Sequence, residues 1–501
     1  FGGAAMDNIA DVIMTGETAN NYFGISVSQA GDINGDGYSD VIVGAYGYSS
    51  FTGKTYIYFG GTAMNNVADI LITGEATNNY FGASVSSAGD VNGDGYSDVI
   101  AGAFGYSSNK GRAYLYDYFM KNEITHDMSM TGETTNTLFG SSVSSAGDVN
   151  GDGYSDVIIG AFRYSSNTGR AYIYFGGPGM DNIADVTLTG AFPNFLFGES
   201  VSSAGDVNGD GYSDVIVGAT GYSLSTGRAY IYFGGAAMDN IADVTMTGGA
   251  IGNYFGVSVS SAGDVNSDGY ADVIVGANQY SAETGRAYIF FGGAAMDNLA
   301  DVTMTGEETS SSFGFSVTSA GDVNGDGYSD VIVGAFQYSS FTGRAYIYFG
   351  GEAMDNAADV TMTGEAISNS FGRSVSTAGD VNNDGYTDVI IGASGYSSFT
   401  GKAYIYFGGA VVDNIADVAM TGETANNNFG LSVSSAGDVN GDGFPDVIAG
   451  AQGYSASTGR AYIFFGGAAM NNISDVTMTG EAVFSSFGSS VSSAGDVNGD
   501  G

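Results

Sequence analysis

Apolar and polar residues follow a strand-like pattern through the first 58 residues of the chain. Residues 11–16 (DVIMTG) and 25–31 (ISVSQAG) place apolar side chains largely at every second position, as in a strand with one buried face. Residues 40–45 (DVIVGA) and 54–60 (KTYIYFG) are apolar or aromatic on both faces, which predicts strands covered on both sides. Turn-forming residues separate these segments, and no helical periodicity is present. We therefore expect a blade of four short antiparallel strands that stacks on similar blades.

The same pattern recurs every 58 residues, with no insertion or deletion. Such a constant period predicts a repeat architecture in which each unit packs mainly against its neighbours. Two stretches differ between repeats, residues 18–22 and 46–52 with their equivalents, and this variation is typical of surface loops. The repeats are 1–58, 59–116, 117–174 (with a divergent start), 175–232, 233–290, 291–348, 349–406 and 407–464, followed by a partial repeat, 465–501.

One loop in each repeat carries an oxygen-bearing side chain at every second position. In the first repeat this loop is GDINGDGYSD (31–40), and positions 1, 3, 5, 7 and 9 are Asp32, Asn34, Asp36, Tyr38 and Asp40. Tyr38 can offer its backbone carbonyl, and Gly37 permits the sharp turn that wraps a chain around an ion. Calcium binds about six to eight hard oxygen ligands in flexible loops, whereas magnesium demands a tighter octahedron. An EF-hand would need a glutamate at position 12, but Val43 stands there, inside a predicted strand.

The motif recurs as a complete set in eight repeats, which distinguishes a metal site from an ordinary turn. Asp, Asn and Gly commonly form turns, so a single copy would leave both interpretations open. Three carboxylates held close together repel one another unless a cation is present, and all eight copies keep three. We therefore predict one calcium ion in each of eight complete hairpin loops, and a ninth loop that lacks its closing aspartate. The further predicted ligands are Asp90, Asn92, Asp94, Tyr96, Asp98, Asp148, Asn150, Asp152, Tyr154, Asp156, Asp206, Asn208, Asp210, Tyr212, Asp214, Asp264, Asn266, Asp268, Tyr270, Asp272, Asp322, Asn324, Asp326, Tyr328, Asp330, Asp380, Asn382, Asp384, Tyr386, Asp388, Asp438, Asn440, Asp442, Phe444, Asp446, Asp496, Asn498 and Asp500.

The charge and residue content of the chain argue against several classes of function. The 54 acidic and 12 basic residues give a net charge of -42, which attracts cations and repels the phosphates of nucleic acid. The chain has no cysteine, so it forms no disulfides, and this is compatible with an extracellular location. No run approaches the ~18 apolar residues that span a bilayer. With one histidine and no distinctive serine nucleophile, we do not expect an enzyme.

Eight of the 12 basic residues occupy the same position of successive repeats. A cation kept at one position among many carboxylates is expected to pair locally, although an exposed ion pair contributes only about 0–1 kcal/mol. The candidate partners are the aspartates equivalent to Asp11, such as Asp69, Asp185 and Asp243. The eight cations are Lys54, Arg112, Arg170, Arg228, Arg286, Arg344, Lys402 and Arg460.

Three elements of each repeat together resemble a known family. Phe23-Gly24, the loop 31–40 and Gly44-Ala45 are similar to the FG-GAP repeat of integrin α-chain β-propellers and related bacterial extracellular proteins. The resemblance covers essentially the whole chain and implies an all-β fold of four-stranded blades, with calcium held in the hairpin between two strands of each blade. The proline of the family name is absent; Tyr46 replaces it in the first repeat. A single closed ring does not account for eight periods and part of a ninth, so we expect an excerpt of a longer array, either an open stack or more than one propeller.

Near-identity of the repeats favours a non-enzymatic, extracellular, structural protein. Such a protein would self-associate into a surface filament, fibril or matrix stabilised by one calcium ion per repeat. The alternative is an adhesion or recognition module that binds protein or glycan through its variable loops, such as residues 20–24 (NNYFG) and 191–198 (AFPNFLFG). Loops rich in Ser and Thr can accept O-linked sugars, and Asn472 begins the one N-glycosylation sequon (NIS).

Overall fold

The fold is built from four-stranded antiparallel sheets. The computed structural model describes residues 23–31, 33, 40–59, 68–92, 96–116, 128–177, 180–437, 444–467, 470–479 and 491. Within these residues, 32 strands form eight sheets, each with its strands in sequence order. The first sheet is β1 (Phe23–Gly31), β2 (Asp40–Ala45), β3 (Lys54–Tyr58) and β4 (Ile70–Thr73).

The other seven sheets repeat this order. They are β5 (Ser84–Gly89), β6 (Asp98–Ala103), β7 (Arg112–Tyr116) and β8 (Met128–Thr131); β9 (Ser142–Gly147), β10 (Asp156–Ala161), β11 (Arg170–Tyr174) and β12 (Val186–Thr189); β13 (Phe197–Gly205), β14 (Asp214–Ala219), β15 (Arg228–Tyr232) and β16 (Val244–Thr247); β17 (Val259–Gly263), β18 (Asp272–Ala277), β19 (Arg286–Phe290) and β20 (Val302–Thr305); β21 (Ser316–Gly321), β22 (Asp330–Ala335), β23 (Arg344–Tyr348) and β24 (Val360–Thr363); β25 (Phe371–Gly379), β26 (Asp388–Ala393), β27 (Lys402–Tyr406) and β28 (Val418–Thr421); and β29 (Phe429–Gly437), β30 (Asp446–Ala451), β31 (Arg460–Phe464) and β32 (Val476–Thr479).

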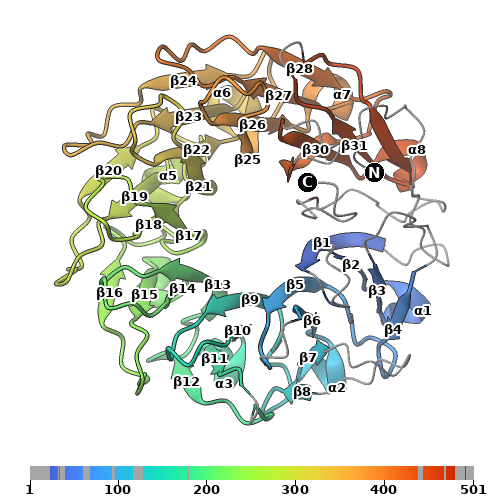
Figure 1. The fold of residues 1–501 in the computed structure, drawn as a ribbon, viewed down its shortest axis with the longest axis vertical. Helices are drawn as coiled ribbons and strands as arrows, with labels where there is room; N and C mark the ends of the chain where they lie inside the picture. Colours follow the sequence, from blue (N-terminus) through green and yellow to red (C-terminus); the bar gives the residue numbers. More distant parts are fainter. Residues whose placement is uncertain are drawn as a thin grey trace.

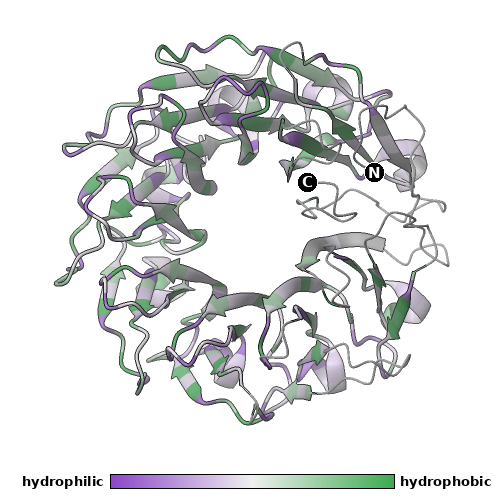
Figure 2. Ribbon diagram, in the orientation of Figure 1, coloured by the Kyte–Doolittle hydropathy of each residue, from purple (hydrophilic) through white to green (hydrophobic). Residues whose placement is uncertain are grey.

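The sheets are arranged around a central opening, with the first strand of each sheet innermost and the fourth at the outer rim (Figure 1). Apolar residues run along the strands (Figure 2), and the hydrophobic core lies between neighbouring sheets. Between the fourth and fifth sheets, for example, Ile216, Ile231 and Met246 pack with Phe255 and Val275. Burial of both faces of each sheet therefore depends on its neighbours, as the two-sided apolar pattern predicts.

The eighth sheet packs against the first. Ile448 and Ala461 of the eighth sheet belong to one buried cluster with Val43 and Tyr56 of the first. These are the equivalents of the residues that meet at the other sheet interfaces, such as Ile390 and Ala403 with their neighbours across the interface. In the described residues the eight sheets thus form one ring and not an open stack, because packing the terminal sheets together removes two apolar faces from water.

The predicted strands agree closely with those observed. β2 has the predicted bounds, β1 begins two residues before the predicted segment 25–31, and β3 ends two residues before the predicted end. The segment 11–16 lies outside the described residues, but its equivalent in the next repeat contributes β4, which pairs with β3. Each sheet therefore combines three strands of one repeat with one strand of the next, which joins neighbouring repeats covalently and by hydrogen bonds.

A short turn that the sequence did not predict joins the second and third strands of every sheet. It is left-handed: Ser223 and Leu224 have φ of 43° and 58°. A four-residue segment is too short to show a helical period, so no sequence pattern indicated it. No helix in the described part of the chain is long and apolar enough to cross a membrane. The turns are α1 (Tyr48–Phe51), α2 (Tyr106–Asn109), α3 (Tyr164–Asn167), α4 (Tyr222–Ser225), α5 (Tyr280–Glu283), α6 (Tyr338–Phe341), α7 (Tyr396–Phe399) and α8 (Tyr454–Ser457).

The antiparallel order gives the ring two chemically different faces. In the fourth sheet, residues 206–213 and 233–243 connect strands at one end, and residues 220–227 and 248–258 connect them at the other. We call the first end, with its equivalents in the other sheets, the metal-loop face, because it carries the predicted calcium loops. The second end, with its equivalents, carries the left-handed turns and is called the turn face.

Candidate functional site

The predicted calcium loops curl around the carboxylate of their first aspartate. Asp148 Oδ1 accepts hydrogen bonds from the backbone N–H groups of Gly151 (2.7 Å) and Asp152 (3.2 Å), and Asp148 Oδ2 accepts one from Gly153 (2.9 Å). Gly153 has φ of 91°, a conformation that favours glycine. The loops that begin at Asp206 and Asp322 repeat all three bonds. The turn is therefore built by its own acidic side chain.

The second and third predicted ligands of the loop hold each other. Asn150 Oδ1 accepts the backbone N–H of Asp152 (2.9 Å), and Asn150 Nδ2 donates to Asp152 Oδ2 (2.9 Å). Asp152 Oδ1 accepts the backbone N–H of Tyr154 (3.0 Å). The same three bonds recur in the other four fully described loops, so side chains at positions 1, 3 and 5 keep a fixed arrangement.

The closing aspartate begins the second strand and is completely buried. Asp156 is 0% exposed, and its two oxygens accept the backbone N–H groups of Val149 (2.7 Å) and Gly176 (2.7 Å). Burial raises the pKa of its carboxyl to about 7, and the nearby Asp152 and Asp148 act in the same direction against the two N–H groups. The same pKa of about 7 holds for the four equivalents Asp214, Asp272, Asp330 and Asp388.

Five predicted loops are described in full, namely 148–156, 206–214, 264–272, 322–330 and 380–388. In each, the structure brings the predicted side chains into one loop, but among the described residues no three acidic or histidine side chains form a group that could hold a metal ion. Asp40, Asp90, Asn92, Tyr96, Asp98, Phe444 and Asp446 are described individually. The predicted ligands outside the described residues are Asp32, Asn34, Asp36, Tyr38, Asp94, Asp438, Asn440, Asp442, Asp496, Asn498 and Asp500.

The chemistry of the donor set fits calcium. Each complete loop offers three carboxylates, one amide oxygen and backbone carbonyls, with no nitrogen or sulfur donor at the alternating positions. Asp272, buried with a pKa of about 7, can carry its negative charge at lower cost beside a divalent cation. The fit therefore rests on the all-oxygen set and on a buried carboxylate in every fully described loop.

The loops contact one another around the metal-loop face. The backbone N–H of Ser213, in one loop, donates to the carbonyl of Asp148 in the preceding loop (3.0 Å). The ring of Tyr212 lies against Gly151, where an added Cβ would stand only 2.2 Å from a ring carbon. Equivalent backbone bonds link Ala271 to Asp206 and Thr387 to Asp322. A change in one loop therefore reaches its neighbour through short backbone contacts.

The buried closing aspartates predict an unusual pH dependence for calcium-free protein. Their pKa is about 7 in the folded chain against an ordinary 3.8, so between these values the folded chain holds more protons than the unfolded chain. The free energy of unfolding should therefore fall as pH rises from about 4 to about 7. Calcium requires the ionised carboxylate, so its affinity should rise over the same interval.

Thermal unfolding of protein stripped of calcium on a chelating resin, followed at several pH values, measures this dependence. Asp272→Asn removes one buried titrating group and should make the pH dependence shallower. Asp239→Asn, which removes an exposed aspartate outside the predicted loops from the same face, is the matched control. Calcium-free protein that gains stability as pH rises through this interval would contradict the assignment.

Among the described residues, five of the eight cations in the row pair with glutamates and not with the predicted aspartates. Arg112 Nη1 lies 2.6 Å from Glu75 Oε1, and Lys402 Nζ lies 2.6 Å from Glu365 Oε1. The predicted partner Asp69 instead accepts the backbone N–H of Phe59 (2.8 Å). The prediction was wrong because β3 and β4 are antiparallel: Asp69 precedes β4 and lies at the metal-loop face, whereas the cations begin the third strands at the turn face.

Each of these cations also covers a tyrosine of the left-handed turn. The guanidinium carbon of Arg112 lies 3.8 Å from the ring centroid of Tyr106, and Lys402 Nζ lies 4.1 Å from that of Tyr396. These distances are within the range of cation–π attraction. The tyrosines at this repeat position therefore have a local structural role on the turn face.

The sequence pointed to the variable loops, but it did not predict the aromatic groups that form on the turn face. Tyr80 lies 4.9 Å from Phe104 and 5.1 Å from Phe51, measured between ring centroids. In another sector, Phe315 and Phe336 lie 4.7 Å apart. The available signal was variation, because these residues fall in the positions that differ between otherwise near-identical repeats.

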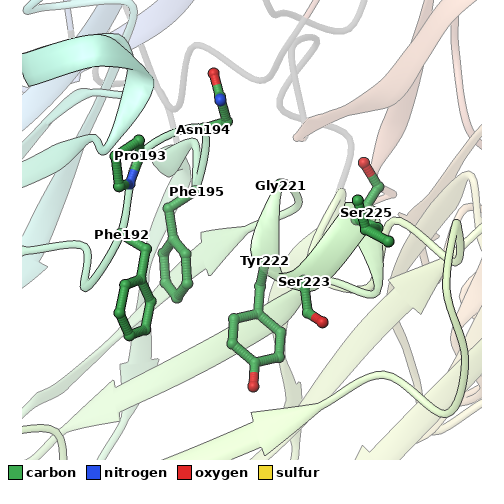
Figure 3. Close-up of a pocket in the computed structure, with 9 residues that line it drawn as sticks. Phe192, Pro193, Asn194, Phe195, Gly221, Tyr222, Ser223 and Ser225 are labelled. Carbon is green, nitrogen blue, oxygen red and sulfur yellow. The ribbon is translucent and has the colours of Figure 1, made fainter.

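A hollow of about 580 Å³ opens on the turn face of the fourth sheet (Figure 3). It is lined by Phe192, Pro193, Asn194, Phe195, Gly221, Tyr222, Ser223, Leu224 and Ser225. Phe192 and Leu224 are exposed by 64% and 76%, and the ring of Phe195 packs edge-on against Tyr222 at 5.3 Å. The segment 191–198, which stood out in the sequence, thus forms one wall of an apolar surface depression.

Sequence comparison places the repeats among known proteins. A family model described as FG-GAP repeat matches more than half of the chain, at residues 23–58, 81–116, 139–174, 197–232, 255–290, 313–348, 371–406 and 429–464. Integrin alpha-5 of Xenopus laevis is 34% identical over 222 residues, which cover 40% of this chain and 20% of that protein. Integrin alpha-4 of Xenopus laevis is 32% identical over 247 residues, covering 47% and 23% respectively. The chain thus matches about a fifth of the length of these relatives.

Structural comparison agrees on the fold. The crystal structure of Chaetomium thermophilum Sqt1 superposes with a TM-score of 0.53 at 10% sequence identity, covering 88% of this chain and 95% of that one. A likeness at this identity concerns the fold alone, and the matched architecture is a ring of four-stranded sheets. The eight family matches each begin at, or up to four residues before, the first strand of a sheet and end at the last residue of the third. The chain belongs to the FG-GAP repeat family, and its fold is an all-β propeller of eight four-stranded sheets.

Proposed function

We propose that this chain is a non-enzymatic propeller that recognises another protein through its turn face and is stabilised by calcium on its metal-loop face. The observation that carries the proposal is the unequal distribution of variation between the two faces. The predicted metal loops keep the same ligand side chains at positions 1, 3, 5 and 9 in every complete repeat, whereas the turn face carries different aromatic and charged residues from sheet to sheet. Uniform loops suit a shared structural task, and a varied surface suits recognition of one asymmetric partner.

The composition of the turn face supports recognition of a protein. It presents exposed large apolar side chains, among them Leu224, Phe341, Ile367 and Phe399, which are 76%, 44%, 72% and 53% exposed. Aromatic residues and arginines are the side chains that contribute most to protein interfaces. The similarity to integrin alpha chains supports an extracellular or cell-surface location, and the lack of cysteine is compatible with it.

Calcium has a structural task in this proposal. The ligands would be the side chains at positions 1, 3, 5 and 9 of each loop and the carbonyl at position 7, as in Asp264, Asn266, Asp268, Tyr270 and Asp272. The ion would supply positive charge among carboxylates that otherwise repel one another. The chain's own residues hold the loop in its curled form through the bonds that Asp264 and Asn266 accept.

A filament or matrix scaffold is the second candidate, and the near-identity of the repeats favours it. The closure of the eight described sheets into a ring favours recognition instead, because stacking of one chain on the next would need apolar sheet faces that the ring covers. Negative-stain electron microscopy with calcium distinguishes the two. Discrete rings support the recognition module, and long fibres with a regular axial repeat would contradict it.

Selection of binding peptides tests the recognition proposal directly. A phage-displayed library of random nonapeptides is selected on immobilised, calcium-loaded protein, and the selected clones are retested on two matched variants. Leu224→Ser/Phe341→Ser/Phe399→Ser removes exposed apolar groups from the turn face, and Ile241→Ser/Leu299→Ser/Ile415→Ser removes groups of 69–70% exposure from the metal-loop face. The proposal expects most clones to be lost on the first variant and kept on the second. Clones that still bind both variants, or that lose binding only on the second variant, would contradict it.

A further inference from the structure

An ion pair recurs on the turn face and joins consecutive repeats. The cation that begins the third strand of a sheet lies against a glutamate located 37 residues earlier in the chain. In the described residues this pair is present five times, as Arg112–Glu75, Arg170–Glu133, Arg344–Glu307, Lys402–Glu365 and Arg460–Glu423. In four of them the bond is made by Nη1 of the guanidinium.

Two neighbouring repeats keep the arginine but lack the glutamate. The equivalent positions hold Ala191, opposite Arg228, and Gly249, opposite Arg286. Neither arginine has an ion-pair partner among the residues that the structure describes, although each keeps its tyrosine, with the guanidinium carbon 3.7 Å from the ring centroids of Tyr222 and Tyr280. In a chain of net charge -42, these are cations held in place without a carboxylate.

Other hydrogen bonds hold the guanidinium groups of these two arginines in place. Arg228 Nε donates to Thr247 Oγ1 (3.0 Å) and Nη2 donates to Tyr222 Oη (2.8 Å). Its Nη1, the atom that binds glutamate in other repeats, has only a long contact of 3.4 Å with Tyr230 Oη. Arg286 Nε donates to Thr305 Oγ1 (2.9 Å). Both guanidinium groups are thus held in place, and each keeps an N–H donor that is available to a carboxylate.

A buried tyrosine hydroxyl lies beside the position of the missing glutamate in the fifth sheet. In three repeats that keep the glutamate, a core tyrosine also donates to it, as Tyr404 does to Glu365 (3.1 Å). The equivalent Tyr288 is 7% exposed, and its hydroxyl has no hydrogen-bond acceptor in the described structure, which is also true of Tyr346 in a repeat that keeps the glutamate. A Cβ added at Gly249 would lie 3.8 Å from this hydroxyl and 3.9 Å from Arg286 Nη1. At Gly249, two hydrogen-bond donors therefore lie within 4 Å of the point where a glutamate side chain would begin.

Surface hollows adjoin both places. The hollow of about 580 Å³ lined by Phe192, Phe195 and Leu224 shares Tyr222 with Arg228 (Figure 3). A second hollow of about 450 Å³ shares Tyr280 with Arg286 and includes Ile251, which is 69% exposed. Glu283 lies in the wall of the second hollow, and its negative charge repels a carboxylate that binds there. The site at Arg228 should therefore bind an acidic side chain more tightly than the site at Arg286.

We infer that the turn face of the fourth and fifth sheets binds an acidic side chain of a partner protein, with the carboxylate taking the place of the glutamate absent at Ala191 and Gly249. A large apolar side chain next to the acidic residue would enter the adjoining hollow. The largely apolar lining around Phe192 and Leu224 favours a peptide over an acidic sugar, whose hydroxyl groups need many polar partners. Strongly acidic partners are disfavoured by the field of the whole chain. This inference specifies the partner for the recognition proposed above and rests on that proposal.

The test compares two phage libraries of random nonapeptides, one with a fixed central Phe-Glu and one with Phe-Gln, on calcium-loaded protein. We expect about tenfold stronger enrichment of the Phe-Glu library, because a hydrogen bond to a charged carboxylate is stronger than one to a neutral amide. Ala191→Glu/Gly249→Glu restores the internal carboxylates and should abolish this preference. The matched control Ala191→Gly/Gly249→Ala changes the same two positions without filling the place of the glutamate and should keep it.

A gain-of-function variant completes the design. Glu307→Ala frees Arg344 and should raise Phe-Glu enrichment above that of the natural chain. Equal enrichment of the two libraries, or a Phe-Glu preference that survives Ala191→Glu/Gly249→Glu, would overturn the inference, as would binding of a sialic acid oligosaccharide without binding of Phe-Glu phage. If unrestricted peptides bind the turn face regardless of these charges, the recognition proposal stands and only the carboxylate site is refuted.

Discussion

Removal of calcium is expected to lower the stability of this protein more than any single substitution. An ion that binds only the folded loop stabilises it by about 2.7 kcal/mol at a hundredfold excess over its dissociation constant, and the chain has eight complete loops. The loops also contact one another through backbone bonds such as that from Ser213 to Asp148, so loss of one ion should weaken the next site. Calorimetry with calcium and after addition of a chelator measures the effect.

Two comparisons show whether the loops are responsible for this effect. Magnesium should restore little of the lost stability, because it accepts the loop's ligand set poorly. Asp268→Asn should lower the calcium-loaded midpoint, whereas Asp297→Asn, which removes the same charge outside the predicted ligands, should not. Equal unfolding midpoints with and without calcium would show that the loops are turns and not metal sites.

Substitution of the glycine one residue before the end of a second strand is expected to have the largest effect of any single change in the core. A Cβ added at Gly276 would lie 2.1 Å from the backbone oxygen of Gly314, which comes just before the first strand of the next sheet, so the two sheets would have to separate. We expect Gly276→Ala to cost about 3 kcal/mol or more, at the upper end of overpacking effects. The same close approach recurs at Gly160 and Gly218, so the same packing constraint applies in other sheets of the ring.

Urea unfolding in saturating calcium measures the cost. Gly249→Ala is the matched control, because an added Cβ there meets nothing closer than 3.8 Å. The control should change the unfolding midpoint little, and calcium affinity should be the same in both variants. A Gly276→Ala chain as stable as the control would mean that neighbouring sheets are not packed as closely as the ring requires.

Most of the local structure could be predicted from the sequence because short-range patterns determine it. The alternation and the apolar runs of residues 25–31, 40–45 and 54–60 identified three strands of the first sheet within two residues. The loop motif similarly identified the curled turn around Asp148, which depends on bonds between residues at most five apart. The left-handed turns, such as Tyr222–Ser225, could not be predicted, since four residues carry no period.

The candidate sites divide in the same way. The predicted metal ligands lie within single loops, so their spacing in the sequence was enough to group them. Whether an arginine of the row is paired, in contrast, depends on a residue 37 positions away in the chain. The sequence showed that Arg228 and Arg286 occupy a shared repeat position, but it suggested the wrong partners, because strand direction decides which end of a sheet a residue reaches. Only the observed pairs revealed that Ala191 and Gly249 stand where glutamates belong.

The sequence by itself determined the repeat, its strands, its acidic loops and its family, since each depends on residues close together or on a constant period. The tertiary structure decided what depends on distant contacts. Whether eight sheets stack openly or form a ring is settled by packing between Val43 and Ile448, more than 400 residues apart in the chain. The chemical difference between the two faces of the ring likewise follows from antiparallel pairing, which carries alternate connections to opposite ends of every sheet.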